Sequence, residues 1–210
     1  MRVRFKKDAE EVLNNFDRYI TKIDNKEIKY EIEIGMGKGK FITENAIKNP
    51  DKMYIGIELS KSVLSLAVKK LLRYEEENNV KVENLRFMCI DAIDLEKYFT
   101  KVDNIYLNFS DPWHKARHDK RRLTHTNFLK IYEKILNENG KINFKTDNRK
   151  LFEFSIKEIN CYKMKIEEIS LDLHKDNDEK NITTEYEEKF KEKGPIYKLV
   201  ASYINKSVSS

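Results

Sequence analysis

The chain has 210 residues and a formal net charge of +5; 40% of the residues are hydrophobic and 37% are charged. This composition allows a packed core under a highly charged surface, and the length favours one large domain over two small ones. No segment approaches the ~20 apolar residues of a membrane-spanning helix, and the N-terminal region lacks the apolar stretch of a secretion signal. We therefore exclude an integral membrane protein and expect a soluble, cytoplasmic one.

The first residues differ from the rest of the chain. They contain a basic arm, Arg2–Lys7, followed by an amphipathic stretch with Val12, Leu13, Phe16 and Ile20. The arm could contact RNA or lie solvated at the surface. We expect residues 1–27 to form an arm and a helix packed on a single domain that spans residues 28–206.

Strands and helices alternate along that domain. The predicted strands are Ile28–Ile34, Met53–Leu59, Leu85–Ile90, Asn104–Phe109 and Lys141–Lys145. A helix is predicted after an N-cap at Ser60, with an apolar face of Leu64, Val68, Leu71 and Leu72. Further helices are predicted over Thr126–Asn137 and Leu151–Ile159, and two strands, Met164–Leu171 and Ile196–Ile204, follow.

This order of elements predicts an α/β fold. Five strands that alternate with helices imply a mostly parallel, doubly wound sheet. The last two strands have no long crossover helix between them, so one of the two should be antiparallel to the rest. The arrangement resembles the Rossmann-like class I methyltransferases, with their antiparallel C-terminal strand.

A glycine-rich turn follows the first strand, in the sequence Glu33-Ile34-Gly35-Met36-Gly37-Lys38-Gly39. Such a turn brings the backbone close to a ligand and presents free N–H groups, although it could also be a tight turn without a ligand. A dinucleotide site would need the spacing GxGxxG, which is absent. Glu33 would repel a pyrophosphate but suits a cationic ligand such as S-adenosylmethionine.

Acidic residues also follow the next strands. Glu58 ends the second strand, where a carboxylate can accept both hydroxyls of a ribose, and Asp91 ends the third, where it could accept from an adenine amino group. Asp111 ends the fourth strand. Each acid alone could be a solvated strand end, but together they mark the edge where open α/β sheets bind ligands.

Asp111 lies within the segment Asn108-Phe109-Ser110-Asp111-Pro112-Trp113-His114-Lys115, and five Lys or Arg residues occur between Lys115 and Arg122. An acid beside an indole ring can bind a nucleobase, and a local cluster of Lys and Arg side chains can bind phosphates. Trp113 could stack on the base or brace the loop. The pattern predicts a chemical site built into a nucleic-acid-binding surface.

The motifs together resemble the bacterial tRNA (guanine-N7-)-methyltransferases over residues 28–204. The resemblance is carried by the glycine turn, by Gly56-Ile57-Glu58, by Asp91-Ala92 and by the Asp-Pro-Trp-x-Lys segment with its basic continuation. Thr146-Asp147-Asn148 and Thr184-Glu185-Tyr186-Glu187 complete it. The departures are Ala116, which interrupts the basic run, and His114, which stands where proline is a familiar alternative; both bear only on RNA affinity.

The resemblance implies transfer of a methyl group from S-adenosylmethionine to N7 of the variable-loop guanine of tRNA, with S-adenosylhomocysteine as product. Asp111 would be the catalytic residue. The cofactor would be bound by Glu33, Gly35, Gly37, Glu58, Asp91 and Asp111. The target guanosine would be held by Lys115, Asp147, Thr184, Glu185, Tyr186 and Glu187, and the tRNA by Arg117, His118, Lys120, Arg121 and Arg122.

Several alternatives remain at this stage. The chain could be a catalytically silent RNA-binding protein on a methyltransferase fold, or a methyltransferase that acts on another RNA. An NAD-dependent oxidoreductase is disfavoured by the glycine spacing. A metal is not expected, because His114, His118, His125 and the two cysteines lack metal-ligand spacing. Neither a monomer nor a homodimer is excluded.

Overall fold

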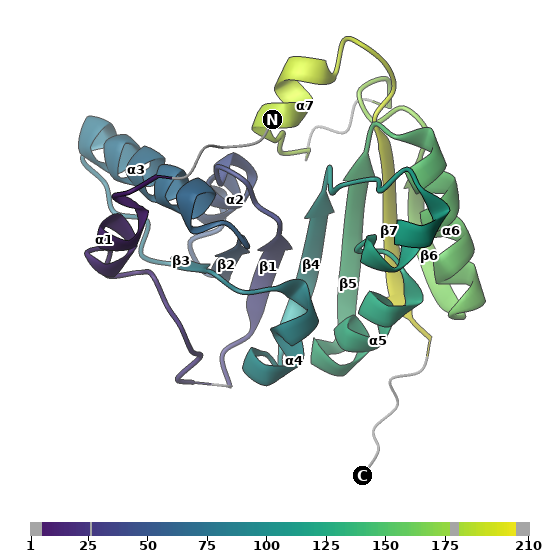
Figure 1. The fold of residues 1–210 in the computed structure, drawn as a ribbon, viewed down its shortest axis with the longest axis horizontal. Helices are drawn as coiled ribbons and strands as arrows, with labels where there is room; N and C mark the ends of the chain where they lie inside the picture. Colours follow the sequence, from purple (N-terminus) through teal and green to yellow (C-terminus); the bar gives the residue numbers. More distant parts are fainter. Residues whose placement is uncertain (1–5, 26, 177–180, 205–210) are drawn as a thin grey trace.

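The computed structural model describes residues 6–25, 27–176 and 181–204. A single seven-stranded sheet with strand order β3-β2-β1-β4-β5-β7-β6 runs through the molecule (Figure 1). The first five strands are parallel, and β7 is antiparallel to both of its neighbours. This confirms the predicted sheet. The strands are β1 Tyr30–Ile34, β2 Met53–Ile57, β3 Leu85–Met88, β4 Val102–Asn108, β5 Leu136–Thr146, β6 Met164–Ser170 and β7 Tyr197–Tyr203.

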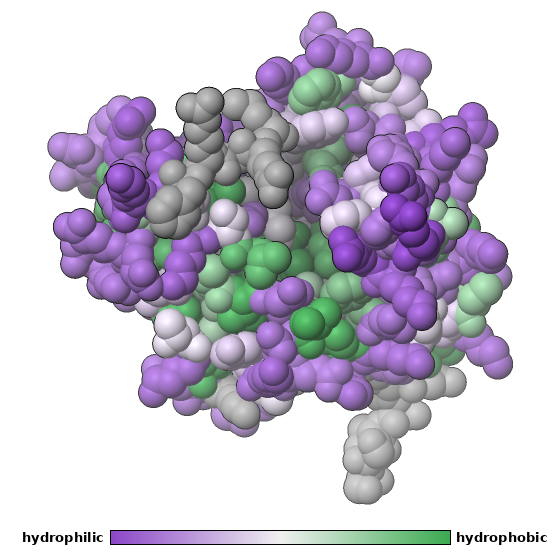
Figure 2. Space-filling view, viewed as in Figure 1, coloured by the Kyte–Doolittle hydropathy of each residue, from purple (hydrophilic) through white to green (hydrophobic). Residues whose placement is uncertain are grey.

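Helices cover both faces of the sheet. The described α-helices are α1 Ala9–Asn14, α2 Lys40–Lys48, α3 Lys61–Asn78, α4 Leu95–Tyr98, α5 Thr126–Ile135, α6 Arg149–Cys161 and α7 Glu185–Phe190. Two short 3-10 helices are η1 Ala92–Asp94 and η2 Ala116–Arg121. In this part of the chain no helix is long and apolar enough to cross a membrane. Hydrophilic residues cover the outer margins of the molecule, and hydrophobic surface gathers in the middle of the face drawn in Figure 2.

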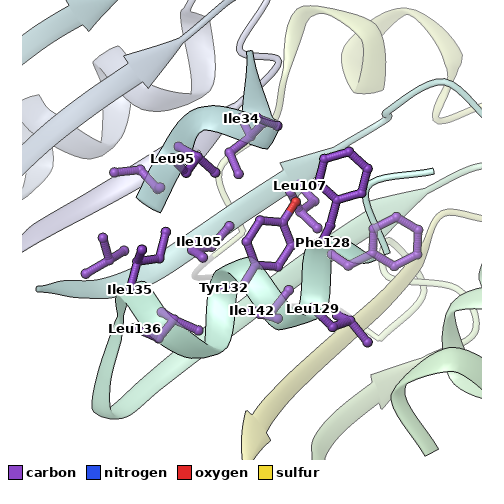
Figure 3. Close-up of a cluster of buried hydrophobic side chains, with 14 of the residues drawn as sticks. Ile34, Leu95, Ile105, Leu107, Phe128, Leu129, Tyr132, Ile135, Leu136 and Ile142 are labelled. Carbon is purple, nitrogen blue, oxygen red and sulfur yellow. The ribbon is translucent and has the colours of Figure 1, made fainter. Parts of the chain in front are cut away.

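The hydrophobic core is split in two by the sheet. Tyr54 of β2 packs with residues of α1, α2 and α3, whereas its neighbour Ile55 belongs to the cluster that lies under α4, α5 and α6. Successive strand residues point to opposite faces, so one strand serves both clusters. Figure 3 shows the second cluster, in which Ile105 and Leu107 of β4 face Phe128 and Tyr132 of α5. Both clusters brace the strand ends that carry the site.

Two local expectations need correction. The helix predicted over Thr126–Asn137 ends at Ile135, because Leu136 already pairs with Val102 of β4. Leu72, expected inward, is 45% exposed, since it lies at the rim of the buried stripe of α3. The N-cap prediction at Ser60 is confirmed by a hydrogen bond from the Val63 amide to its hydroxyl.

The segment before β1 packs on the rest of the chain. Leu13 and Phe16 are buried in the cluster under α1–α3. Arg18 is also buried, and its guanidinium donates to both carboxylate oxygens of Glu75 at 2.5 and 2.7 Å. This bidentate pair ties the segment to the end of α3. Residues Arg2 and Arg4 of the basic arm lie outside the described residues.

Candidate active site

The glycine turn forms the first wall of a cleft at the carboxyl ends of the strands. Gly35 and Gly37 have φ values of +74° and +59°, a left-handed conformation that a side chain would strain. Glu58, at the end of β2, accepts hydrogen bonds from the backbone amides of Gly37 at 3.2 Å and Ser60 at 3.0 Å. One carboxylate therefore fixes the turn after β1 against the start of α3.

The cleft has a volume of about 390 Å³ and is built from the ends of four neighbouring strands. Asp91 lies on its wall and caps η1, with Oδ1 accepting from the Ile93 amide at 3.1 Å. Three of the four predicted acids, Glu58, Asp91 and Asp111, are brought together here. Most of the remaining lining is apolar: Ile34, Ile57, Leu59, Ile90, Ala92, Phe109, Trp113 and Leu123. Arg121 also borders the cleft.

The fourth acid, Glu33, is not part of the cleft lining. The residue is 2% exposed, and the side-chain amide of Asn108, at the end of β4, donates to its Oε1 at 2.9 Å. No group of the described residues donates to Oε2. Burial raises the pKa of Glu33 to about 8. Glu33 lies on the opposite face of β1 from Ile34, which lines the cleft, because adjacent strand residues alternate between faces. Its contact with the cofactor stays a prediction.

Asp111 is exposed and borders two hollows. One is the cleft; the other, with a volume of about 460 Å³, is lined by the loop from Asp111 to Lys115 and by His118. The loop begins at Phe109 and turns at Trp113, both with left-handed φ values, +51° and +42°. Such angles are uncommon for residues with side chains and gather at functional sites.

Two predicted guanosine ligands contact each other across the mouth of the site. The Tyr186 hydroxyl donates to Oδ2 of Asp147 at 2.8 Å, and its ring lies 5.0 Å from that of Phe109. Burial and the neighbouring carboxylate raise the pKa of Tyr186 to about 12, so the hydroxyl keeps its proton at neutral pH. Figure 1 shows α7, which carries Tyr186, beyond the arrowhead ends of the strands.

Glu187, predicted to bind the substrate, is fully buried within the described part of the chain, and its substrate role stays a prediction. Its carboxylate accepts from the ammonium of Lys145 at 2.7 Å and from the amide of Asn181 at 2.8 Å. Burial lowers the pKa of Lys145, while the charge of Glu187 opposes that shift. Thr184 is 8% exposed and caps α7 by accepting from the Glu187 amide. Both residues position α7.

Sequence reasoning missed Lys145. It occupies a strand position next to Asp147 and carries no motif that distinguishes it from a surface lysine. Only the folded structure, in which β5 lies close to α7, shows that its ammonium donates hydrogen bonds to Glu187 and to the carbonyl of Ile182. Two further ion pairs hold the same helix, between Lys70 and Glu185 at 2.5 Å and between Lys40 and Glu188.

The basic segment after the loop divides into two groups. Arg117, Lys120 and Arg121 are exposed, and the Arg121 guanidinium lies 4.9 Å from the centre of the Trp113 ring. His118 is half-buried with its ring 5.8 Å from the same indole. Arg122 points inward, with a side chain only 12% exposed. Arg122 is therefore less accessible than the other predicted RNA-binding arginines, Arg117 and Arg121.

The sheet order and the cleft at its carboxyl edge are those of the Rossmann-like class I methyltransferase fold. Solved structures support the fold: one titled "Structure of an antibiotic related Methyltransferase" has a TM-score of 0.60 at 18% identity. Another, of the 16S rRNA methyltransferase KamB, has a TM-score of 0.62 at 12% identity. In each case the similarity covers 97% of this chain and 97% of the other.

Sequence comparison narrows the class. The family model described as "Putative methyltransferase" matches residues 27–199. A protein of Lysinibacillus sphaericus (strain C3-41), named tRNA (guanine-N(7)-)-methyltransferase, is 47% identical over 98% of this chain and 100% of its own length. A protein of the same name from Streptococcus pyogenes serotype M6 is 46% identical over 97% and 100%. The chain belongs to the tRNA (guanine-N7-)-methyltransferase family.

Proposed function

We propose that this protein transfers a methyl group from S-adenosylmethionine to N7 of the variable-loop guanine of tRNA. The position of Asp111 carries the proposal. It stands on the wall between a cleft that suits the methyl donor and a hollow beside Trp113 and Lys115 that suits a nucleobase. Family membership supports the same reaction. The cytoplasmic location expected from the sequence follows from this substrate and is proposed with it.

The residues of the cleft fit the cofactor. A side chain added at Gly35 or Gly37 would meet no atom within 4 Å, so the turn leaves open space for a ligand against its backbone. Glu58 would accept the ribose hydroxyls and Asp91 the adenine amino group. Both already accept backbone N–H groups, but a carboxylate offers about four acceptor sites in total. When bound, S-adenosylmethionine supplies an electrophilic methyl group on a positively charged sulfur.

Guanine N7 carries a lone pair and no proton, so the reaction needs no general base to create the nucleophile. The chain has to orient the base and stabilise the positive charge that the ring gains. Asp111 supplies a negative charge at the junction of the two hollows. Asp147 would accept from the N1–H and amino group of guanine, sharing its carboxylate with Tyr186 or displacing that hydroxyl.

The tRNA would lie across the exposed basic side chains that follow the loop. Arg117, Lys120 and Arg121 offer cations to phosphates, with His118 beside them. Lys115, at the start of η2, would contact the target nucleotide. A base within folded tRNA has to be exposed or turned outward to reach Asp111, which explains an aromatic and basic loop at this point.

A labelling experiment tests the proposal. The purified protein is incubated with methyl-labelled S-adenosylmethionine and two tRNA transcripts, one with guanine and one with adenine at the variable-loop position. Label in the guanine transcript alone, released by cleavage chemistry specific for 7-methylguanosine, is the expected result. Label in both would contradict the target and indicate another site. No label, with S-adenosylmethionine still bound, would favour a different RNA or the silent RNA-binding protein.

A further inference from the structure

Arg122 belongs to the basic segment by sequence but not by position. Its side chain is 12% exposed, whereas Arg117 and Arg121 on the same segment are exposed. The guanidinium lies 4.3 Å from the centre of the Phe154 ring of α6 and 2.8 Å from a carboxylate oxygen of Asp119. A cation enclosed in this way is not presented to an RNA phosphate.

The remaining contacts of Arg122 go to the loop that carries Asp111. Its Nε donates to the carbonyl of Pro112 at 2.9 Å, and a terminal nitrogen donates to the carbonyl of Trp113 at 3.0 Å. One planar group thus grips two successive peptide units, which suits the fixed fork of an arginine and not the single ammonium of a lysine.

His118 and Arg121 pack against the Trp113 ring, but the backbone of the loop has few partners. Within the described residues, the two bonds from Arg122 are the only hydrogen bonds made to the stretch Ser110–His114. The same stretch follows Phe109 and contains Trp113, which adopt left-handed backbone angles that residues with side chains avoid. A strained conformation persists only where its surroundings impose it.

We infer that Arg122 is a positioning residue for methyl transfer: it fixes the Pro112–Trp113 backbone so that Asp111 is held between the two hollows. The role of Arg122 in methyl transfer rests on the proposed function. Its role in holding the loop rests on the loop contacts alone. The inference removes Arg122 from the tRNA-binding face, which then consists of the exposed basic side chains around it. Arg121, its sequence neighbour, remains on that face.

The test compares Arg122→Lys and Arg122→Ala with two other variants. Arg73→Lys is the matched control, because Arg73 is an exposed arginine of α3 outside the site. Arg117→Ala removes an exposed arginine of the proposed tRNA-binding face. Three quantities are measured: kcat at saturating tRNA and S-adenosylmethionine, the salt dependence of tRNA binding, and acrylamide quenching of Trp113. The last reports on the loop directly because Trp113 is the only tryptophan.

We expect Arg122→Lys to lower kcat about 100-fold, the size of effect that a small misplacement of a reacting group produces. Its tRNA affinity should stay within a few fold with an unchanged salt slope, and quenching of Trp113 should increase. Arg117→Ala should reduce the slope of log K against log salt by about one. Arg73→Lys should leave all three quantities at wild-type values.

The inference is overturned if Arg122→Ala reduces the salt slope as Arg117→Ala does while Trp113 quenching and kcat stay at wild-type values. Increased quenching with an unchanged kcat would equally reject a role in the reaction. If Arg122→Ala does not fold, Arg122→Lys carries the comparison, with circular dichroism as the check. Absence of methyl transfer in the wild type would refute the proposed function, and the quenching series would still decide whether Arg122 holds the loop.

Discussion

The two sides of the candidate site are held together in different ways. On the cofactor side, carboxylates accept hydrogen bonds from backbone amides of turns: Asp91 from Ile93, and Glu58 from Ser60 and, across the glycine turn, from Gly37. On the substrate side, the contacts join distant segments, as when Lys145 of β5 binds Glu187 of α7. The first side is built from caps and turns, and the second from charged groups that only meet after folding.

This difference predicts different sensitivities. Caps and turns are formed by short segments, so the loss of one changes a ligand contact more than the fold. A buried ion pair between distant segments has no local substitute, and breaking it leaves a charge without its partner. Mutations on the substrate side should therefore affect stability, and mutations on the cofactor side should affect affinity.

The largest expected effect is on the buried pair. Lys145→Met should lower the free energy of unfolding by about 3–5 kcal/mol, because the buried Glu187 carboxylate loses its ammonium partner and keeps only the Asn181 amide and the His174 imidazole beside it. The matched control is Lys70→Met, which removes a half-exposed partner of the same helix and should cost at most about 1 kcal/mol. Urea unfolding measures both values.

Equal losses in the two lysine variants would show that the substrate side is not held by its buried pair. The double variant Lys145→Met, Glu187→Leu tests whether the loss of stability comes from the unpaired charge. Replacement of both charges by apolar groups should restore much of the stability, since no uncompensated charge remains. Methyl transfer should then report whether α7 needs the pair for its position as well as for its stability.

Asp111→Asn should lower kcat by about 100- to 1000-fold, because it removes the negative charge at the junction of the two hollows. The residue is exposed, so unfolding should change little, and tRNA affinity should stay within a few fold. Asp51→Asn, an exposed acid before β2, is the control and should match the wild type. Single-turnover kinetics with labelled cofactor separate this loss from binding; an unchanged rate would remove Asp111 from the reaction.

The buried carboxyl of Glu33 predicts a dependence of stability on pH. Its pKa is about 8 in the folded chain against a reference value of 4.5, so the folded state binds more protons between these values. Its stabilising contribution is complete below pH 4.5 and is lost as the pH rises through about 8, at up to about 1.4 kcal/mol per pH unit. Glu33→Gln should remove this decline.

Urea unfolding of both proteins at several pH values between 4.5 and 9 would measure the difference. Parallel curves for wild type and Glu33→Gln would mean that Glu33 is ionised when folded. That result would return Glu33 to the cofactor side, as a charged neighbour of the cationic ligand.

The smallest effect should come from Glu58→Gln. The amide can no longer offer a charged acceptor to both Gly37 and a ribose hydroxyl, so affinity for S-adenosylmethionine should fall about tenfold with little change in unfolding. Equilibrium dialysis measures the affinity for S-adenosylmethionine. Glu44→Gln, at a half-exposed position of α2, serves as the control. A large loss of stability in Glu58→Gln would contradict the division between the two sides.

Much of the cofactor side could be predicted from the sequence because its signals are local. The N-cap at Ser60 follows from residue type and spacing, and it forms in the structure. Acids after successive parallel strands must meet at one sheet edge, which places Glu58, Asp91 and Asp111 in a single cleft. The reversed last strand followed from the missing crossover helix.

A mostly parallel sheet with an antiparallel C-terminal strand, the ligand-binding edge and the family could all be predicted from the sequence, because strand period, caps and turn chemistry act within a few residues. The strand order became clear only from the folded structure, as did the surroundings of Glu33, Arg122 and Glu187. Each is a charged residue inside a motif, and its role depends on whether distant partners enclose it. Asn108, Phe154 and Lys145 do so, and their approach is a result of packing that no local pattern encodes.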